Sequence, residues 1–264
     1  GDTQAMQRHA AWATGKPDEG RMLRFQAHAA AFSGELETAR ERFGRSVEVA
    51  QRHNLKELAA FTAILEALTE AEFGNYQQAR EGATAALAIA RSRYARGLAA
   101  HTLALSGAIR QAQALADDLG ERFPTDTLVN GVWLPTIRAA IESQRGNPRK
   151  AIEWLQAATP YELGLEPGES PGFTAVYVRG QAYLRMGMGG KAAAEFQKIL
   201  DHRGVDPGSP RYSLAYLGRA RAWALAGETS KSRRAYQDFF ALWKDADPDI
   251  PILLEAKAEY AKLQ

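Results

Sequence analysis

Small and apolar residues recur along the chain at fixed distances from a set of glycines. These glycines are Gly34, Gly74, Gly107, Gly146, Gly187 and Gly227, and successive ones lie 33 to 41 residues apart. A small residue follows each glycine by five positions: Ala39, Ala79, Ala112, Ala151, Ala192 and Ser232. The position nine after each glycine is mostly apolar. Because glycine commonly follows the last turn of a helix, the pattern predicts helical hairpins with a glycine in each turn.

The residues between these glycines favour helix over strand. Ala, Leu, Glu, Gln and Arg are frequent, whereas Val, Ile and Thr are sparse. We therefore predict an all-α fold, with residues 1–264 forming one domain. The predicted hairpins span residues 19–52, 55–91, 93–124, 126–158, 171–206 and 209–245.

Two flanking helices are predicted outside the hairpins. Residues 3–14 form the second half of an incomplete unit that ends at Gly15 and Pro17. The C-terminal segment starts with Asp247 and Pro248, and its predicted helix, residues 249–262, places Ile252, Leu253, Ala256 and Tyr260 on one face. Such a half-polar helix covers the last hairpin, as the open end of a stacked array requires.

The fifth hairpin carries a family pattern. In residues 173–206, Gly180 and Ala192 are small where two helices approach closely, Tyr183 and Phe196 are large, and Gly187 begins the turn. This order resembles a tetratricopeptide repeat (TPR) unit, although the terminal proline of that pattern is displaced to Pro207. The resemblance implies a right-handed α-solenoid of about six TPR-like hairpins.

The TPR resemblance also implies a binding surface. In TPR arrays, the first helix of each hairpin lines a concave groove that faces a bound peptide. Transferred position by position, the candidate partner-binding residues are Arg24, Phe25, His28, Phe32, Tyr94, His101, Trp133, Tyr177, Gln181, Arg185 and Arg221, next to Leu65, Leu68 and Ile137. Aromatic and arginine side chains supply much of the energy of protein interfaces. Packing between adjacent hairpins is an alternative role for Leu65 and Ile137.

A narrower resemblance concerns two segments. Residues 55–87 and 234–264 are similar to the TPR region that follows the kinase domain in bacterial eukaryotic-like serine/threonine protein kinases. This similarity implies a sensor or partner-recruiting region, either cytoplasmic or outside the membrane. The HRD, DFG and glycine-rich motifs of the kinase domain itself are absent from this chain. We therefore expect no catalytic activity here, and Gly1 in place of Met fits a piece of a longer protein.

Composition and the absence of known motifs argue against nucleic acid binding, catalysis, metal binding and membrane insertion. The 33 basic and 31 acidic residues nearly balance, so the chain lacks the basic field that nucleic acid binding requires. No Cys is present, the five His residues are scattered, and no motif for a nucleophile, metal or phosphate occurs. No apolar run is long enough for a membrane span. We expect no catalytic residue, cofactor or metal, and a protein or peptide as the partner.

The connection 159–172 is rich in Pro and Gly and is the candidate for a functional loop. Its Glu162, Glu166 and Glu169 are too irregularly spaced to indicate a cation site, and a tolerated surface insertion is the simpler interpretation. Alternatives to partner binding are self-association through the incomplete N-terminal unit, a free-standing TPR adaptor, and an enzyme that uses this loop as a lid.

Overall fold

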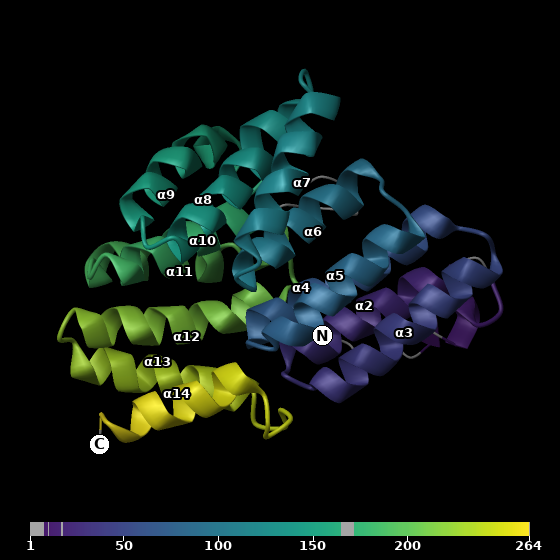
Figure 1. Cartoon of the computed structure of the whole chain (residues 1–264). Coiled ribbons are helices and arrows are strands. Elements are labelled where there is room, and N and C mark those ends of the chain that lie inside the picture. Colours follow the sequence, from purple (N-terminus) through teal and green to yellow (C-terminus); the bar gives the residue numbers. More distant parts are fainter. Residues whose placement is uncertain (1–7, 10, 17, 165–171, 264) are drawn as a thin grey trace.

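The structure is a computed structural model that describes residues 8, 9, 11–16, 18–164 and 172–263 (Figure 1). These residues form helices connected by short turns, and no strand occurs among them. The all-α prediction is therefore confirmed. Successive helices pair into antiparallel hairpins, and the hairpins stack side by side along the chain.

Each hairpin consists of a first and a second helix. The first helices are α2 (Glu19–Phe32), α4 (Lys56–Phe73), α6 (Arg93–Leu105), α8 (Leu134–Gln144), α10 (Thr174–Arg185) and α12 (Pro210–Leu225). The second helices are α3 (Leu36–Arg52), α5 (Tyr76–Ile89), α7 (Ile109–Arg122), α9 (Pro148–Leu155), α11 (Gly189–Asp201) and α13 (Thr229–Leu242). Helix α14 (Pro251–Ala261) follows the last hairpin. Of the predicted helix at residues 3–14, residues 8, 9 and 11–13 are helical, and residues 3–7 and 10 lie outside the described part of the chain.

The turn of each hairpin has the backbone conformation that its glycine was expected to supply. All six turn glycines have positive φ, between +72° at Gly187 and +96° at Gly74. Residues with a side chain seldom adopt this left-handed conformation, whereas glycine adopts it readily. The small residue five positions after each glycine is fully buried, as Ala39 and Ser232 illustrate. The spacing therefore reflects close contact between the two helices of a hairpin.

Bulky side chains fill the spaces between hairpins. Phe196 on α11 is fully buried between two glycines, Gly180 on α10 and Gly218 on α12. A Cβ atom at Gly180 would lie 2.8 Å from the Phe196 ring, and one at Gly218 would lie 2.5 Å from it. The large residue of one hairpin thus fits against small residues of its own and the next hairpin, as the pattern in residues 173–206 predicts.

The fourth hairpin departs from regular α-helix at both ends. Its first helix, predicted to begin at residue 126, starts as a π-helical segment, η1 (Val129–Trp133). Pro135 is the second residue of α8, and because proline has no N–H group to donate, the regular hydrogen-bond pattern is interrupted there. Its second helix, predicted to end at residue 158, continues from α9 as a 3-10 helix, η2 (Gln156–Tyr161). A further 3-10 turn, η3 (Arg203–Val205), precedes α12.

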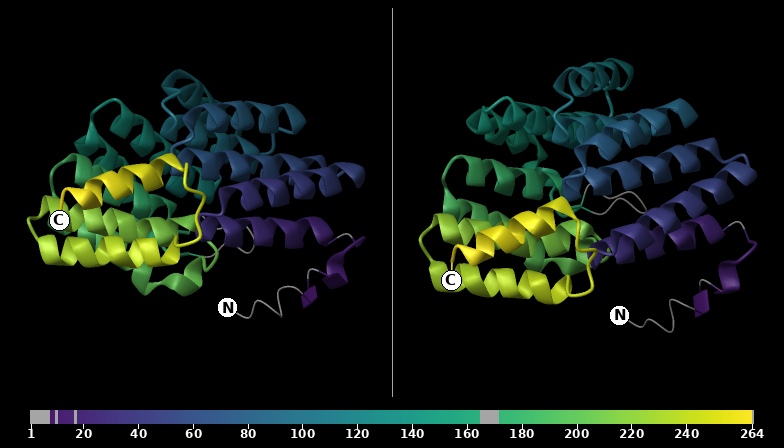
Figure 2. Two further views of the ribbon diagram at one scale, coloured as in Figure 1. Left: turned by 90° about the horizontal axis from the view of Figure 1, so that it is seen from below. Right: turned by 60° about the horizontal axis from the view of Figure 1, so that its bottom comes forward.

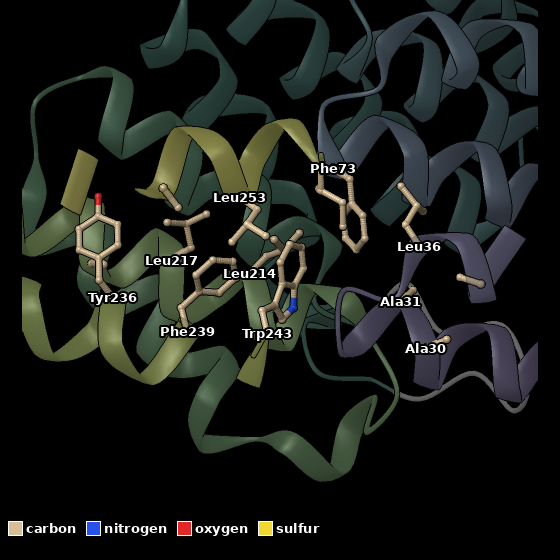
Figure 3. Packing of buried hydrophobic residues seen from close by; sticks show 14 of the residues in the cluster. Ala30, Ala31, Leu36, Phe73, Leu214, Leu217, Tyr236, Phe239, Trp243 and Leu253 are labelled. Carbon is tan, nitrogen blue, oxygen red and sulfur yellow. The ribbon is translucent and has the colours of Figure 1, made fainter. Parts of the chain in front are cut away.

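The array curves until its last hairpin meets its first, which the sequence did not predict. Helix α12 packs against α2, and α14 lies against both α13 and α4 (Figure 2). One hydrophobic cluster accordingly joins residues from the two ends of the array, including Ala31, Phe73, Leu214 and Trp243 (Figure 3). The rings of Phe73 and Trp243 lie 4.9 Å apart. We call this contact of the last hairpin and α14 with the first two hairpins the seam.

Hydrogen bonds fix the seam in addition to apolar packing. The carbonyl oxygen of Phe32 accepts hydrogen bonds from Ser213 Oγ at 2.9 Å and from Trp243 Nε1 at 3.0 Å. Asp247 donates its backbone N–H to the carbonyl of Gly34 at 3.1 Å, and its carboxylate accepts from the backbone N–H of Glu37 at 2.7 Å. We expected α14 to cover an open end of the array. The last hairpin is instead docked on the first hairpin, so that end is not open.

Candidate functional site

The first helices of the hairpins face inward, and they enclose a cavity of about 340 Å³. We call it cavity 1. Its walls come from α2, α4, α6, η1 and α8 and from Thr174 at the start of α10, together with residues 205–211 at the start of the sixth hairpin. The wall formed by 205–211 is present only because the seam brings the sixth hairpin next to the first. Curvature of the array thus converts part of a concave groove into a cavity.

One side of cavity 1 is aromatic. The rings of Phe61 and Tyr94 lie 6.3 Å apart, and those of Tyr94 and Trp133 lie 5.0 Å apart. The guanidinium group of Arg24 lies over the Phe61 ring at 5.1 Å. Helices supply the remaining apolar wall with Leu65, Leu68 and Ile137. The Trp133 ring occupies space that exists because position 97 is glycine, where a Cβ atom would lie 2.7 Å from it.

Another part of the wall of cavity 1 contains a buried ion pair. Arg211 Nη2 lies 2.6 Å from Glu72 Oε1, and the two side chains are 10% and 5% exposed. Burial raises the pKa of Glu72, and the charge and hydrogen bond of Arg211 oppose that effect. Burial also raises the pKa of the neighbouring Asp206, against the influence of Arg211. This side of the cavity therefore contains one cation between two carboxyl groups.

Two histidines complete the wall of cavity 1. Burial, reinforced by the charges of Arg24 and Arg211, lowers the pKa of His28 to about 4. Burial and the charge of Arg211 lower the pKa of His101 to about 3. Both imidazoles are therefore neutral at pH 7. Effective general bases have a pKa near the working pH, so these two histidines are poorly suited to that role.

A second, smaller cavity of about 150 Å³ lies beside the first, and Glu72 contributes to both. We call it cavity 2. Its wall includes Tyr177 and Gln181 on α10, and burial, followed by the charge of Glu72, raises the pKa of Tyr177 to about 12. Arg185 donates to the backbone carbonyl of Ser143. Cavity 2 is thus bordered by arginines that already have partners within the chain.

Arg221 is the other arginine of cavity 2. Its Nε donates to Glu259 at 2.9 Å, and its Nη2 lies 3.2 Å from Glu255. Both carboxylates belong to α14, so Arg221 ties the last helix to α12. The predicted groove arginines Arg185 and Arg221 therefore both have partners within the chain. Reversing the charge of Arg221 would remove contacts that hold α14.

The structure gathers most of the predicted groove residues into the two cavities. Cavity 1 receives Arg24, Phe25, His28, Tyr94, His101 and Trp133. Cavity 2 receives Tyr177, Gln181, Arg185 and Arg221. Phe32 lines neither cavity, and it stacks on Tyr212 at the seam with ring centroids 5.9 Å apart. Whether any of these residues binds a partner stays a prediction.

Sequence reasoning missed three charged residues of cavity 1, namely Glu72, Asp206 and Arg211. Groove positions are counted back from each turn glycine, and in the sixth hairpin that count stops short of residues 205–211. Glu72 lies two residues before its turn glycine, as Phe32 and Arg185 do, so the same count reaches it, but only Leu65 and Leu68 were chosen from that helix. The available signal was the sequence DPGSPR at 206–211, whose prolines and Ser mark the start of α12.

The loop predicted at residues 159–172 is only partly described. Glu162 is buried and forms ion pairs with Arg179 and, at 2.5 Å, with Lys198. Arg179 also binds Glu195 at 2.7 Å. Glu162 thus anchors the end of η2 to the fifth hairpin. Glu166 and Glu169 lie outside the described residues, as does most of the proposed lid.

In the described part of the chain, no group of three or more His, Asp or Glu side chains is close enough to hold a metal ion. None of the helices in that part combines the length and apolar character needed to cross a bilayer.

Comparison with known proteins identifies the fold. The structure is similar to that of a tetratricopeptide repeat protein from Parabacteroides merdae ATCC 43184, with a TM-score of 0.55 and 14% sequence identity over 98% of this chain and 90% of that chain. The TPR domain of P58(IPK) aligns with a TM-score of 0.35 and 11% identity over 95% of this chain and 80% of that chain. No family model and no curated protein matches the sequence. The fold is an all-α solenoid of TPR-like hairpins, as the sequence predicted.

Proposed function

We propose that the chain is a noncatalytic scaffold that binds a protein or peptide partner on the inner face of the solenoid. The observation that carries the proposal is an aromatic surface that is open to solvent beside cavity 1. Phe25 lines this cavity and is 50% exposed, although large apolar side chains are usually buried. An exposed aromatic residue next to an apolar hollow is a common feature of protein interfaces.

The arrangement of the inner face favours a partner with apolar anchors over a strongly charged one. Phe25 and the aromatic wall at Tyr94 and Trp133 supply contact area, whereas Arg185 and Arg221 are engaged with Ser143 and with α14. Charged groups that already have partners add little to binding, because the new contact must replace an existing one. Extended or helical segments with one or two large apolar side chains match this surface.

We further propose that this scaffold belongs to a bacterial eukaryotic-like serine/threonine protein kinase. The support is the similarity of residues 55–87 and 234–264 to the TPR region of such kinases. In the structure these segments form α4 and α5, and α13 and α14, which include part of the seam. The scaffold would then recruit substrates or regulators to the kinase domain.

Peptide selection tests the partner-binding role directly. A random peptide library is displayed and selected against the chain, and the affinities of the selected peptides are measured for the wild type and two variants. Phe25→Ala removes the exposed ring beside cavity 1. Leu55→Ala is the matched control, because Leu55 is 43% exposed but lines neither cavity.

We expect Phe25→Ala to weaken binding by about thirty-fold, which corresponds to the loss of roughly 2 kcal/mol at an interface hot spot. Leu55→Ala should leave the affinity unchanged. Equal affinity of the selected peptides for wild type and Phe25→Ala would exclude this part of the inner face as the binding surface.

A second candidate function is self-association, for which Trp12 is the favouring observation. Its side chain is 61% exposed on the N-terminal helical segment, where an incomplete unit offers a surface to another copy. Light scattering over a hundred-fold range of concentration tests this alternative. A monomer at every concentration removes it.

A further inference from the structure

Cavity 1 has the size of a small-molecule site. Its volume is about 340 Å³. Ligand sites in proteins start at about 300 Å³ and combine an apolar wall with a few polar groups. The walls of cavity 1 fit this description, because aromatic and aliphatic side chains face a small set of charged and histidine side chains.

The cavity is also walled by elements that are far apart in sequence. Helices of the first four hairpins form one part of the wall, and residues 205–211 close it from the side of the sixth hairpin. The ion pair between Arg211 and Glu72 crosses this junction and is almost completely buried. The walls are therefore fixed by the seam before any ligand enters, which lowers the cost of ordering a site on binding.

The formal charges around cavity 1 balance. Arg24 and Arg211 contribute two guanidinium groups, and Glu72 and Asp206 contribute two carboxyl groups, of which that of Glu72 is paired with Arg211. His28 and His101 are neutral because their surroundings are apolar and positively charged. A ligand with a net charge would lose its hydration without meeting an opposite charge that is not already engaged. The cavity therefore favours an uncharged ligand.

One polar atom in the wall indicates a ligand group. His101 Nδ1 is buried and has no hydrogen-bond partner among the described residues. Buried polar atoms in folded proteins nearly always have a partner. A ligand N–H or oxygen in contact with this imidazole would supply one that the described protein groups do not.

We propose that cavity 1 binds a small, uncharged, mostly aromatic molecule that carries a single hydrogen-bonding group. The flat rings of Phe61, Tyr94 and Trp133 pack against its ring, and His101 meets its polar group. Indole, with nine non-hydrogen atoms and one N–H, is a probe of this class. The inference does not rest on the proposed partner-binding role, because the probe is measured on the chain alone.

The test compares three probes that share one ring system and differ in charge. Isothermal titration calorimetry with the full 264-residue chain measures the binding of indole, of indole-3-acetate, which is an anion, and of tryptamine, which is a cation. We expect indole to bind with one-to-one stoichiometry and both charged probes to bind at least about ten-fold more weakly. Tighter binding of either charged probe, or no binding of indole at millimolar concentration, overturns the proposal.

Two variants locate the site. Leu65→Trp introduces a larger side chain into the wall of cavity 1, and Gln181→Leu changes cavity 2 alone. We expect Leu65→Trp to abolish indole binding and Gln181→Leu to retain it. Indole binding that persists in a folded Leu65→Trp variant overturns the assignment to cavity 1. If Leu65→Trp does not fold, the charge series on the wild type still decides the proposal.

Discussion

Replacing Gly34 by alanine tests whether the two ends of the solenoid meet. Gly34 lies in the turn of the first hairpin with φ +79°. A Cβ atom built there would lie 2.6 Å from Ala246 Cβ and 2.8 Å from the Trp243 ring, both of which belong to the last hairpin and the segment after it. Gly107 in the third hairpin is the matched control, because it has φ +80° and nothing within 4 Å of the same Cβ position.

The two substitutions share a backbone cost and differ in a steric cost. Alanine in the left-handed region costs about 1–2 kcal/mol, partly offset by about 0.4–1 kcal/mol because alanine restricts the unfolded chain. Gly107→Ala should therefore lower the free energy of unfolding by about 1 kcal/mol. Gly34→Ala adds overpacking at the seam, worth about 1–3 kcal/mol. We expect it to be less stable than Gly107→Ala by that amount.

Urea unfolding followed by circular dichroism measures both variants, and small-angle X-ray scattering of the folded Gly34→Ala protein shows whether the seam has opened. Adding Ala246→Gly to Gly34→Ala removes the nearest clashing atom and should recover part of the lost stability, which is a coupling between residues distant in sequence. Equal destabilisation by Gly34→Ala and Gly107→Ala would refute the seam. It would mean that the first and last hairpins do not touch in solution.

The remaining predictions concern buried charged and titratable groups. Glu162→Gln should lower the free energy of unfolding, measured in urea, by about 3 kcal/mol, because the Glu162 side chain is 3% exposed and its loss leaves Arg179 without one of its two carboxylates. The control Glu153→Gln, on the exposed side of α9, should change the free energy of unfolding by less than about 0.5 kcal/mol. Equal effects of the two substitutions would contradict the buried pairing. His28 has a pKa of about 4 in the folded chain and 6.5 when unfolded, so the unfolded state binds more protons between these values and stability falls as the pH falls from 6.5 towards 4. His28→Gln should remove on the order of 2 kcal/mol of this loss between pH 7 and pH 4.5, and an unchanged pH dependence would show that folding does not lower the pKa of His28.

Local features of the fold were predictable from sequence because they depend on short stretches of chain. The spacing of five residues between Gly187 and Ala192 follows from a tight turn and a close helix contact, so it does not depend on how the rest of the array curves. The TPR resemblance, counted back from each turn glycine, also assigned Tyr94 and Trp133 to the inner face, and their ring centroids lie 5.0 Å apart in the structure.

The seam and the full site were not predictable because they depend on the whole array. Each hairpin is rotated slightly from its neighbour by the side chains between them, and the sum of these rotations decides whether the last hairpin reaches the first. Arg211 lines cavity 1 only because these accumulated rotations bring the sixth hairpin next to the first. In the same way, nothing local to Arg221 shows that α14 returns to bind it.

Contact between the first and last hairpins sets a limit on how such a chain can change in length. Open solenoids grow or shrink by whole repeats during evolution, because each repeat contacts only its neighbours. Here an added or deleted hairpin would move α12 away from α2 and separate Trp243 from the carbonyl of Phe32. Gene duplication within this array would therefore be selected against, and homologues that keep the seam residues should also keep the number of hairpins.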